Sequence, residues 1–284
     1  MMPEFLSEGS ALSDFLRPDR IVVGTDGTAG TRDALEKLCS PFSCPKVWTG
    51  IKAAEMTKYA SNVLLASRIG VVNELAAACM ESGLDIDEVL RGAAMDRRIG
   101  KEFLRAGPGF GGSCLPKDVS AMRLFMEGRG VRPEIIGSLE GSNRRQQELP
   151  VSVLEKMMRL EGASVAILGL SFKAGTDDTR GSPAETIIRM LLERKARVRA
   201  FDPAWNEGMR AAFPDVEYAR SFESCLDGAD AVIIATPWPE FGRSASEYAS
   251  LVPGAPVVDC WRILDQDGAR RAGLKYRAIG RGMP

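Results

Sequence analysis

The chain has 284 residues, of which 45% are hydrophobic and 26% charged, with a formal net charge of −1. This composition is typical of a globular protein with two domains, and the balanced charge gives no sign of nucleic-acid or membrane binding. Histidine is absent, which excludes Ser-His-Asp, Cys-His and His-dependent dehydrogenase chemistry and leads us to expect no metal. No apolar run approaches the roughly 20 residues of a membrane span. Six cysteines without a C-x-x-C pair and no secretory signal predict a reduced, cytoplasmic protein.

The first 160 residues are predicted to be mostly helical after a short strand at residues 20–24. A long helix is expected from about Ile51 to Ser82, because apolar and small residues recur there every three or four positions. The other expected helices cover residues 32–38, 83–96, 118–130 and 133–160, with a break at residues 39–47.

The pattern changes at residue 163, where strands begin to alternate with helices. Apolar strands are expected within residues 163–172, 197–203, 229–236 and 253–261, and a helix at residues 183–196. Such alternation indicates an α/β fold with a doubly wound parallel sheet, Rossmann-like in type. We therefore expect a central helical domain at residues 45–160 and a C-terminal domain at residues 161–284.

The stretch GPGFGGSCLPKD at residues 107–118 satisfies the dinucleotide-binding pattern G-x-G-x-x-G. No strand precedes it, and Pro116 is unfavourable for a helix that should follow directly. We therefore reject phosphate binding here. The glycines are instead expected to let the backbone approach a ligand closely and to present Cys114.

Cys114 is the candidate nucleophile, because an ammonium such as that of Lys117 favours a thiolate; the alternative is an incidental buried cysteine. Lys58 and Asn62 share one helix face and would together stabilise an oxyanion, or they are a solvated lysine beside a surface asparagine. Lys173 and Arg180 follow a predicted strand, at the sheet edge where α/β folds bind ligands.

Four segments in order resemble the UDP-glucose/GDP-mannose (nucleotide-sugar 6-) dehydrogenase family. They are PEFLSEGSALSDFLRPDRIVVGT, EMTKYASNVLLASRIGVVNELA, GPGFGGSCLPKD and LGLSFKAGTDDTR. The resemblance implies a four-electron oxidation of a sugar C6 alcohol with NAD as cofactor, through a thiohemiacetal and a thioester on a cysteine.

The resemblance also implies roles for individual residues. The catalytic set is Cys114, Lys58, Asn62, Asp118 and Glu4. The substrate-binding set is Phe5, Leu6, Arg98, Phe103, Arg105, Gly111, Lys173 and Arg262, with Arg98 reaching the sugar of a neighbouring subunit. The cofactor-binding set is Glu8, Lys117 and Arg180.

The chain departs from the family pattern at its start. Residues 1–44 resemble only the last part of the family's NAD-binding domain with its connector, so we expect the chain alone to be inactive. The apolar long helix predicts a homodimer, and residues 161–284 are expected to bind the nucleotide sugar. UDP-glucose is preferred as substrate; GDP-mannose, or a nucleotide-sugar-binding dimer without turnover, are the alternatives.

Overall fold

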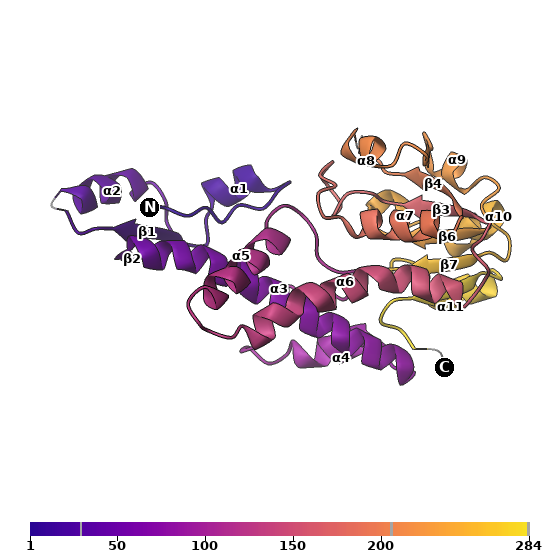
Figure 1. Cartoon of the computed structure of the whole chain (residues 1–284), viewed down its shortest axis with the longest axis horizontal. Helices are drawn as coiled ribbons and strands as arrows, with labels where there is room; N and C mark the ends of the chain where they lie inside the picture. Colours follow the sequence, from indigo (N-terminus) through magenta and orange to yellow (C-terminus); the bar gives the residue numbers. More distant parts are fainter. Residues whose placement is uncertain (29, 205–206, 283–284) are drawn as a thin grey trace. The chain divides into compact units, whose positions relative to one another are not determined.

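A computed structural model describes residues 1–28, 30–204 and 207–282 (Figure 1). The chain forms two compact units, residues 1–64 and residues 65–284, which are described separately. The domain boundaries expected from the sequence, after residues 44 and 160, remain predictions.

The first unit is built on a small βαβ motif. Strands β1 (Ile21–Thr25) and β2 (Lys46–Gly50) pair in parallel, with Ile21 opposite Lys46, and α2 (Thr31–Cys39) connects them. A short helix, α1 (Ala11–Leu16), precedes β1. Strand β2 was not expected, because its five residues are only partly buried and show no alternation of buried and exposed positions.

The predicted helices are present. They are α3 (Ile51–Glu81), α4 (Ile86–Ala93), α5 (Leu115–Glu127) and α6 (Glu134–Glu155). One expectation was wrong: α5 begins directly after residues 107–114, which we call the cysteine loop, and has Pro116 in its first turn. Proline fits there because the first amides of a helix have no intrahelical partner to lose. The residues before the glycines are not a strand, as expected.

Helix α3 also corrects the expectation about apolar runs. By length and composition it could cross a membrane, with a mean hydropathy of 1.5 over its most apolar stretch. The expectation counted uninterrupted apolar residues, whereas α3 reaches this value despite Arg68 and Glu74. Core helices of soluble proteins meet the same criteria, so the observation carries little weight.

The second unit contains a six-stranded, wholly parallel sheet in the order β5-β4-β3-β6-β7-β8 (Figure 1). The strands are β3 (Ser164–Leu168), β4 (Arg197–Phe201), β5 (Glu217–Tyr218), β6 (Ala231–Ile234), β7 (Pro256–Asp259) and β8 (Lys275–Ala278). This order reverses direction between β3 and β6, which confirms the doubly wound α/β fold. The short edge strands β5 and β8 were not predicted.

Alternating residues of the central strands build a core on each face of the sheet. In β3, Val165 and Ile167 pack on one face, while Ala166 and Leu168 pack on the other. Helices α7 (Pro183–Glu193) and α8 (Glu207–Ala212) contribute to the first core. The second core is completed by α9 (Phe222–Leu226), the 3-10 turn Pro239–Phe241, α10 (Ala245–Leu251) and α11 (Gln266–Arg271). Both faces are buried, so the strands read as continuous apolar runs.

Candidate functional site

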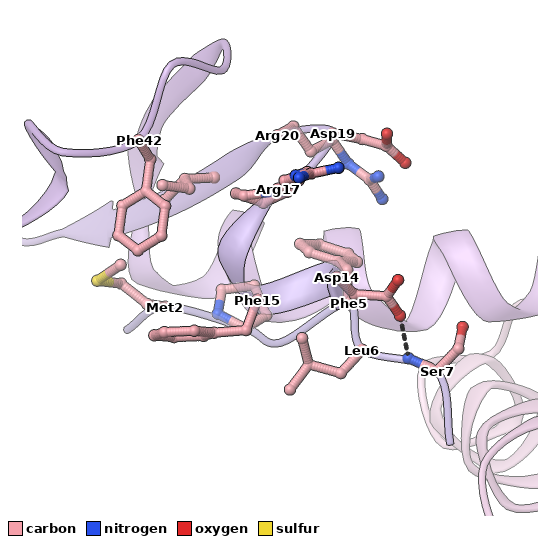
Figure 2. Close-up of a pocket in the computed structure, with 13 residues that line it drawn as sticks. Met2, Phe5, Leu6, Ser7, Asp14, Phe15, Arg17, Asp19, Arg20 and Phe42 are labelled. Carbon is pink, nitrogen blue, oxygen red and sulfur yellow. Dashed lines mark hydrogen bonds between the residues drawn. The ribbon is translucent and has the colours of Figure 1, made fainter. Parts of the chain in front are cut away.

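In the first unit, the segment Pro3–Glu8 borders a hollow of about 350 Å³ (Figure 2). Phe5 and Leu6, two predicted substrate residues, line it together with Phe15, Phe42 and Arg20. The Arg20 guanidinium lies 3.9 Å from the centre of the Phe5 ring, an arrangement that favours both groups. Figure 2 shows the Ser7 amide donating to Asp14, at 2.8 Å.

The other predicted residues of this unit differ in exposure. Glu4 and Glu8 are exposed, whereas Asn62 on α3 is only 7% exposed. Lys58 is half-buried, and its Nζ lies 5.6 Å from the centre of the Phe5 ring. The structure therefore brings Lys58 close to the predicted substrate segment, and Asn62 follows one helical turn later on α3.

In the second unit, Cys114 occupies the position immediately before α5 and is exposed. Of the other five cysteines, four are buried and Cys44 is partly so. Burial raises the pKa of the Cys225 thiol to about 12 and that of Cys260 well above its usual value. Because a thiolate is the reactive form, Cys114 is the cysteine best suited to be a nucleophile.

Two charged residues follow Cys114 on the first turn of α5. The Lys117 ammonium lies 2.5 Å from the Asp118 carboxylate, which is almost completely buried. The amide of Asp118 donates to the Cys114 carbonyl at 2.9 Å. The turn thus fixes Asp118 next to the cysteine backbone, with Lys117 balancing its charge.

The glycine-rich loop before Cys114 is held by amide side chains that sequence reasoning missed. Asn143 makes two bonds to Phe110: its Oδ1 accepts from the amide at 2.7 Å, and its Nδ2 donates to the carbonyl at 2.9 Å. Gln147 donates to the same carbonyl at 3.2 Å. Gln146 donates to the carbonyl of Gly107 at 2.6 Å. Their spacing on α6, at i, i+3 and i+4, places all three amides on one face, although the same spacing is common on solvated helix faces.

Asn73 on α3 completes the support by accepting from the Gly107 amide at 3.0 Å. The close approaches of the loop are thus made to the protein itself. A side chain at Gly109, where φ is +105°, would lie 2.8 Å from Asn143 Oδ1. We expected the glycines to let the backbone approach a ligand; at Gly109 the absent side chain lets the backbone approach α6.

The cysteine loop also meets the loop that follows β3. The amide of Gly112 donates to the carbonyl of Arg180 at 2.9 Å, and a side chain at Gly111 would overlap the carbonyl of Gly181. The Arg180 guanidinium is largely exposed and pairs with Asp178 at 2.8 Å. Three predicted residues, Gly111, Cys114 and Arg180, therefore come from two loops in direct contact.

Lys173 lies on the same loop after β3. Its Nζ is 5.4 Å from the centre of the Phe172 ring, and Phe172 packs against Gly112 of the cysteine loop. Through Phe172, the structure places Lys173 near the cysteine loop; its substrate role remains a prediction.

Arg262 was predicted to bind substrate, and its guanidinium is 1% exposed. It pairs with Asp87 at 2.8 Å and donates to the carbonyls of Ala106 and Ile279. Its φ of +59° is in the left-handed region, a strain that a non-glycine residue tolerates only when its surroundings enforce it. The visible role of Arg262 is to fix the start of the cysteine loop to α4 and β8.

Phe103, Arg105 and Arg98 lie before the cysteine loop. Phe103 is exposed and also left-handed, with a φ of +57°. Arg105 stacks 5.1 Å from the centre of the Trp261 ring; burial, and then the charge of Arg262, lowers its pKa. Arg98 is 84% exposed and pairs with Asp96 at 2.6 Å. Phe103 and Arg98 thus present their side chains to solvent.

Two sequence profiles of one family match the chain. The profile of the UDP-glucose/GDP-mannose dehydrogenase family, central domain, matches residues 52–145, and that of its UDP binding domain matches residues 166–266. The chain belongs to this family. Within it, the cysteine loop lies in the central domain, and the loop carrying Lys173 and Arg180 lies in the UDP binding domain.

Relatives within the dehydrogenase family align along almost the whole chain. UDP-glucose 6-dehydrogenase AglM of Haloferax volcanii is 42% identical, covering 98% of this chain and 65% of its own length. A UDP-glucose 6-dehydrogenase of Pseudomonas aeruginosa is also 42% identical, with 98% and 64% covered. The structure of a UDP-glucose dehydrogenase from Pyrobaculum islandicum superposes with a TM-score of 0.90 at 37% identity, covering 99% of this chain and 63% of that one. The chain thus spans about two-thirds of its relatives' length.

NAD and metal ions require different arrangements of residues. Among residues 1–28, 30–204 and 207–282, no group of three metal-binding side chains occurs. The G-x-G-x-x-G glycines follow irregular backbone in place of a strand, so they do not form the strand–turn–helix that holds a pyrophosphate. The cofactor roles of Glu8, Lys117 and Arg180 remain predictions, and the residues that the structure describes form no complete dinucleotide site.

Proposed function

We propose that this chain carries the substrate-binding and thiol chemistry of a UDP-glucose 6-dehydrogenase, which oxidises the C6 hydroxyl of UDP-glucose to a carboxylate. The observation that supports it most is Cys114, exposed at the start of α5 on a loop in contact with the loop of Lys173 and Arg180. Two relatives at 42% identity are UDP-glucose 6-dehydrogenases, which favours UDP-glucose over GDP-mannose as the substrate.

The cofactor proposed for this reaction is NAD, which when bound would accept the hydrides released in the two oxidations of C6. Between them, the Cys114 thiolate adds to the C6 aldehyde and forms a thiohemiacetal. The second oxidation leaves a thioester, and attack by water on its carbonyl releases the carboxylate and returns the thiolate. The thiohemiacetal and the thioester are thereby held by the same sulfur atom.

The other candidate residues act on charge and protons. Lys58 supplies a cation and Asn62 an amide donor to the oxyanion that forms at C6. Asp118, next to Cys114 and buried, takes the proton of the attacking water, and Glu4 takes the proton of the C6 hydroxyl. Phe5, Leu6, Gly111 and Lys173 hold the nucleotide sugar. Glu8, Lys117 and Arg180 contact NAD.

We infer that residues 1–284 by themselves bind UDP-glucose but reduce NAD very slowly, because the described residues lack a complete dinucleotide site. Isothermal titration of UDP-glucose and GDP-mannose into the chain tests the substrate; tighter binding of GDP-mannose would reverse the assignment. Absorbance of NADH, with UDP-glucose and NAD supplied, tests turnover. Rapid NADH formation by these residues alone would contradict the inference.

The protein is further proposed to be a cytoplasmic homodimer that assembles through α3. Val71 and Leu75, one turn apart on this helix, are 58% and 45% exposed, and apolar side chains in such a row are stabilised by a partner. Arg98, also exposed, would then reach the neighbouring subunit's substrate. Sedimentation of the wild type and of Val71→Glu tests this: a monomeric wild type would contradict it.

A further inference from the structure

The loop that carries Cys114 has few side chains of its own to hold it. Between Gly107 and Gly112 it contains four glycines and a proline, so its shape must be imposed from outside. Amide side chains hold it at Gly107 and at Phe110, and three of these bonds are made to Phe110, which is buried.

Asn143 is suited to this task by its chemistry. A carboxamide offers an acceptor and a donor side by side, and Asn143 uses both on the backbone of Phe110, at 2.7 and 2.9 Å. Gln147, one helical turn later, donates a further bond to the same carbonyl. We call Asn143 and Gln147 the amide clamp.

The clamp is itself anchored on α7. The hydroxyl of Thr186 donates to Gln147 Oε1 at 3.1 Å, so the Gln147 amide nitrogen is directed at Phe110. Beyond Phe110, the Gly112 amide bonds the Arg180 carbonyl, and α5 begins directly after Cys114. The thiol therefore lies between two fixed points, the clamped loop and α5.

We propose that Asn143 is a positioning residue, which holds the Cys114 loop in the shape that binds the nucleotide sugar and presents the thiol to C6. Thr186 supports it through Gln147. This inference rests on the proposed function of Cys114, because the clamp acts on the sugar only through that loop. Asn143 and Thr186 themselves need no contact with the substrate.

The test compares three variants of the 284-residue chain. Asn143→Ala removes both bonds and leaves the Phe110 amide unpaired. Thr186→Val retains every bond to the loop and only releases Gln147. Tyr248→Phe is the matched control: it removes a buried hydrogen bond to the Phe241 carbonyl, 2.9 Å long, from the core on the α10 side of the sheet.

Three readouts are measured on each variant: hydrogen exchange of the peptide covering residues 107–118, the rate at which iodoacetamide alkylates Cys114, and UDP-glucose affinity by calorimetry. For Asn143→Ala we expect hydrogen exchange about tenfold faster, UDP-glucose affinity about tenfold weaker and a measurable change in the alkylation rate. For Thr186→Val we expect smaller changes of the same sign. Tyr248→Phe should lower the melting temperature comparably without any of these changes.

Each outcome decides the proposal. Unchanged exchange in Asn143→Ala would overturn the clamp. Faster exchange with unchanged affinity and alkylation would overturn the positioning role, as would equal effects of Tyr248→Phe. If the wild type does not bind UDP-glucose, the proposed function fails by itself, and exchange together with Cys114 alkylation still decides the clamp. If Asn143→Ala does not fold, Thr186→Val decides it alone.

Discussion

The cysteine loop and the segment Pro3–Glu8 both carry predicted site residues, yet the chain holds them in opposite ways. The loop is largely buried. Its backbone and that of the residue before it form hydrogen bonds with side chains of α3, of α6 and of the turn that follows β7. In the segment, Phe5 and Pro3 are half-buried and the rest is exposed, with Ser7 bonded to Asp14. The flanking Met1 pairs with Gly24 of β1.

The difference in burial between the two regions shows which of them has a fixed backbone conformation. A buried backbone amide without a partner costs about 1–3 kcal/mol, so each supporting bond in the loop penalises any other loop shape. An exposed amide can exchange its partner for water at little cost. We therefore expect the thiol to be fixed before the substrate arrives, and the segment to adjust to the substrate.

The largest effect should come from the sulfur itself. Cys114→Ser replaces the thiolate with a hydroxyl that is essentially protonated at neutral pH, so the second oxidation should slow by at least about a thousandfold. The measurement is the product ratio in an assay where an NAD-binding domain is supplied. Accumulation of the C6 aldehyde is expected. Full conversion to the carboxylate would show that the reaction does not require the Cys114 thiol.

Loss of the buried arginine should have the next largest effect. Arg262→Met leaves the carbonyls of Ala106 and Ile279 unpaired, while Asp87 is exposed enough to be hydrated. We expect a loss of about 2–4 kcal/mol in the free energy of unfolding. Urea denaturation measures it, with Arg98→Met as the control, because Arg98 forms only an exposed pair. Equal losses in both variants would contradict this ranking.

A methyl group at Gly109 should affect the loop more than its size suggests. Gly109→Ala combines a left-handed φ of +105° with a contact of 2.8 Å to Asn143, so we expect about 1–3 kcal/mol of destabilisation. Thermal denaturation measures it. Gly27→Ala is the control, because Gly27 has a similar φ of +80° but open space around it. The destabilisation of Gly109→Ala beyond that of Gly27→Ala therefore measures the contact with the amide clamp.

The smallest effect is expected in the exposed segment. Asp14→Ala removes the acceptor of the Ser7 amide and of the Ser10 hydroxyl, at 2.8 and 3.0 Å. Both groups are exposed and can bond water, so stability should change by about 0.5 kcal/mol or less. Urea denaturation measures this change in the free energy of unfolding, with Asp14→Asn as control. A loss as large as that in Gly109→Ala would contradict the difference between the cysteine loop and the exposed segment.

Much of the fold was predictable, because the spacing of apolar residues in long segments indicates whether they form helices or strands. Helix α3 and strands β3 and β6 were found from apolar spacing alone. Strand β5 has two residues, and β2 is only partly buried, so neither produces a pattern. Pro116 was misjudged because a breaker of helix interiors is also a good first-turn residue.

The candidate site was less predictable than the fold. Cys114 stands out because its loop is unusual in composition. Asn143 and Gln147 do not, because polar residues on one helix face usually face solvent. Arg262 was expected at a ligand from the family resemblance, and its neighbours in sequence do not show that its guanidinium is buried. Such roles depend on contacts between residues far apart in the chain, which spacing cannot show.

Gly111 and Gly181 have a consequence for how this sequence can evolve. The two residues are 70 positions apart, yet a side chain at Gly111 would occupy the space of the Gly181 carbonyl. Any mutation that enlarges position 111 must therefore be accompanied by a shift of the backbone near position 181. In a broad set of homologues, these two positions should change together or not at all, and their neighbourhoods should share insertions and deletions.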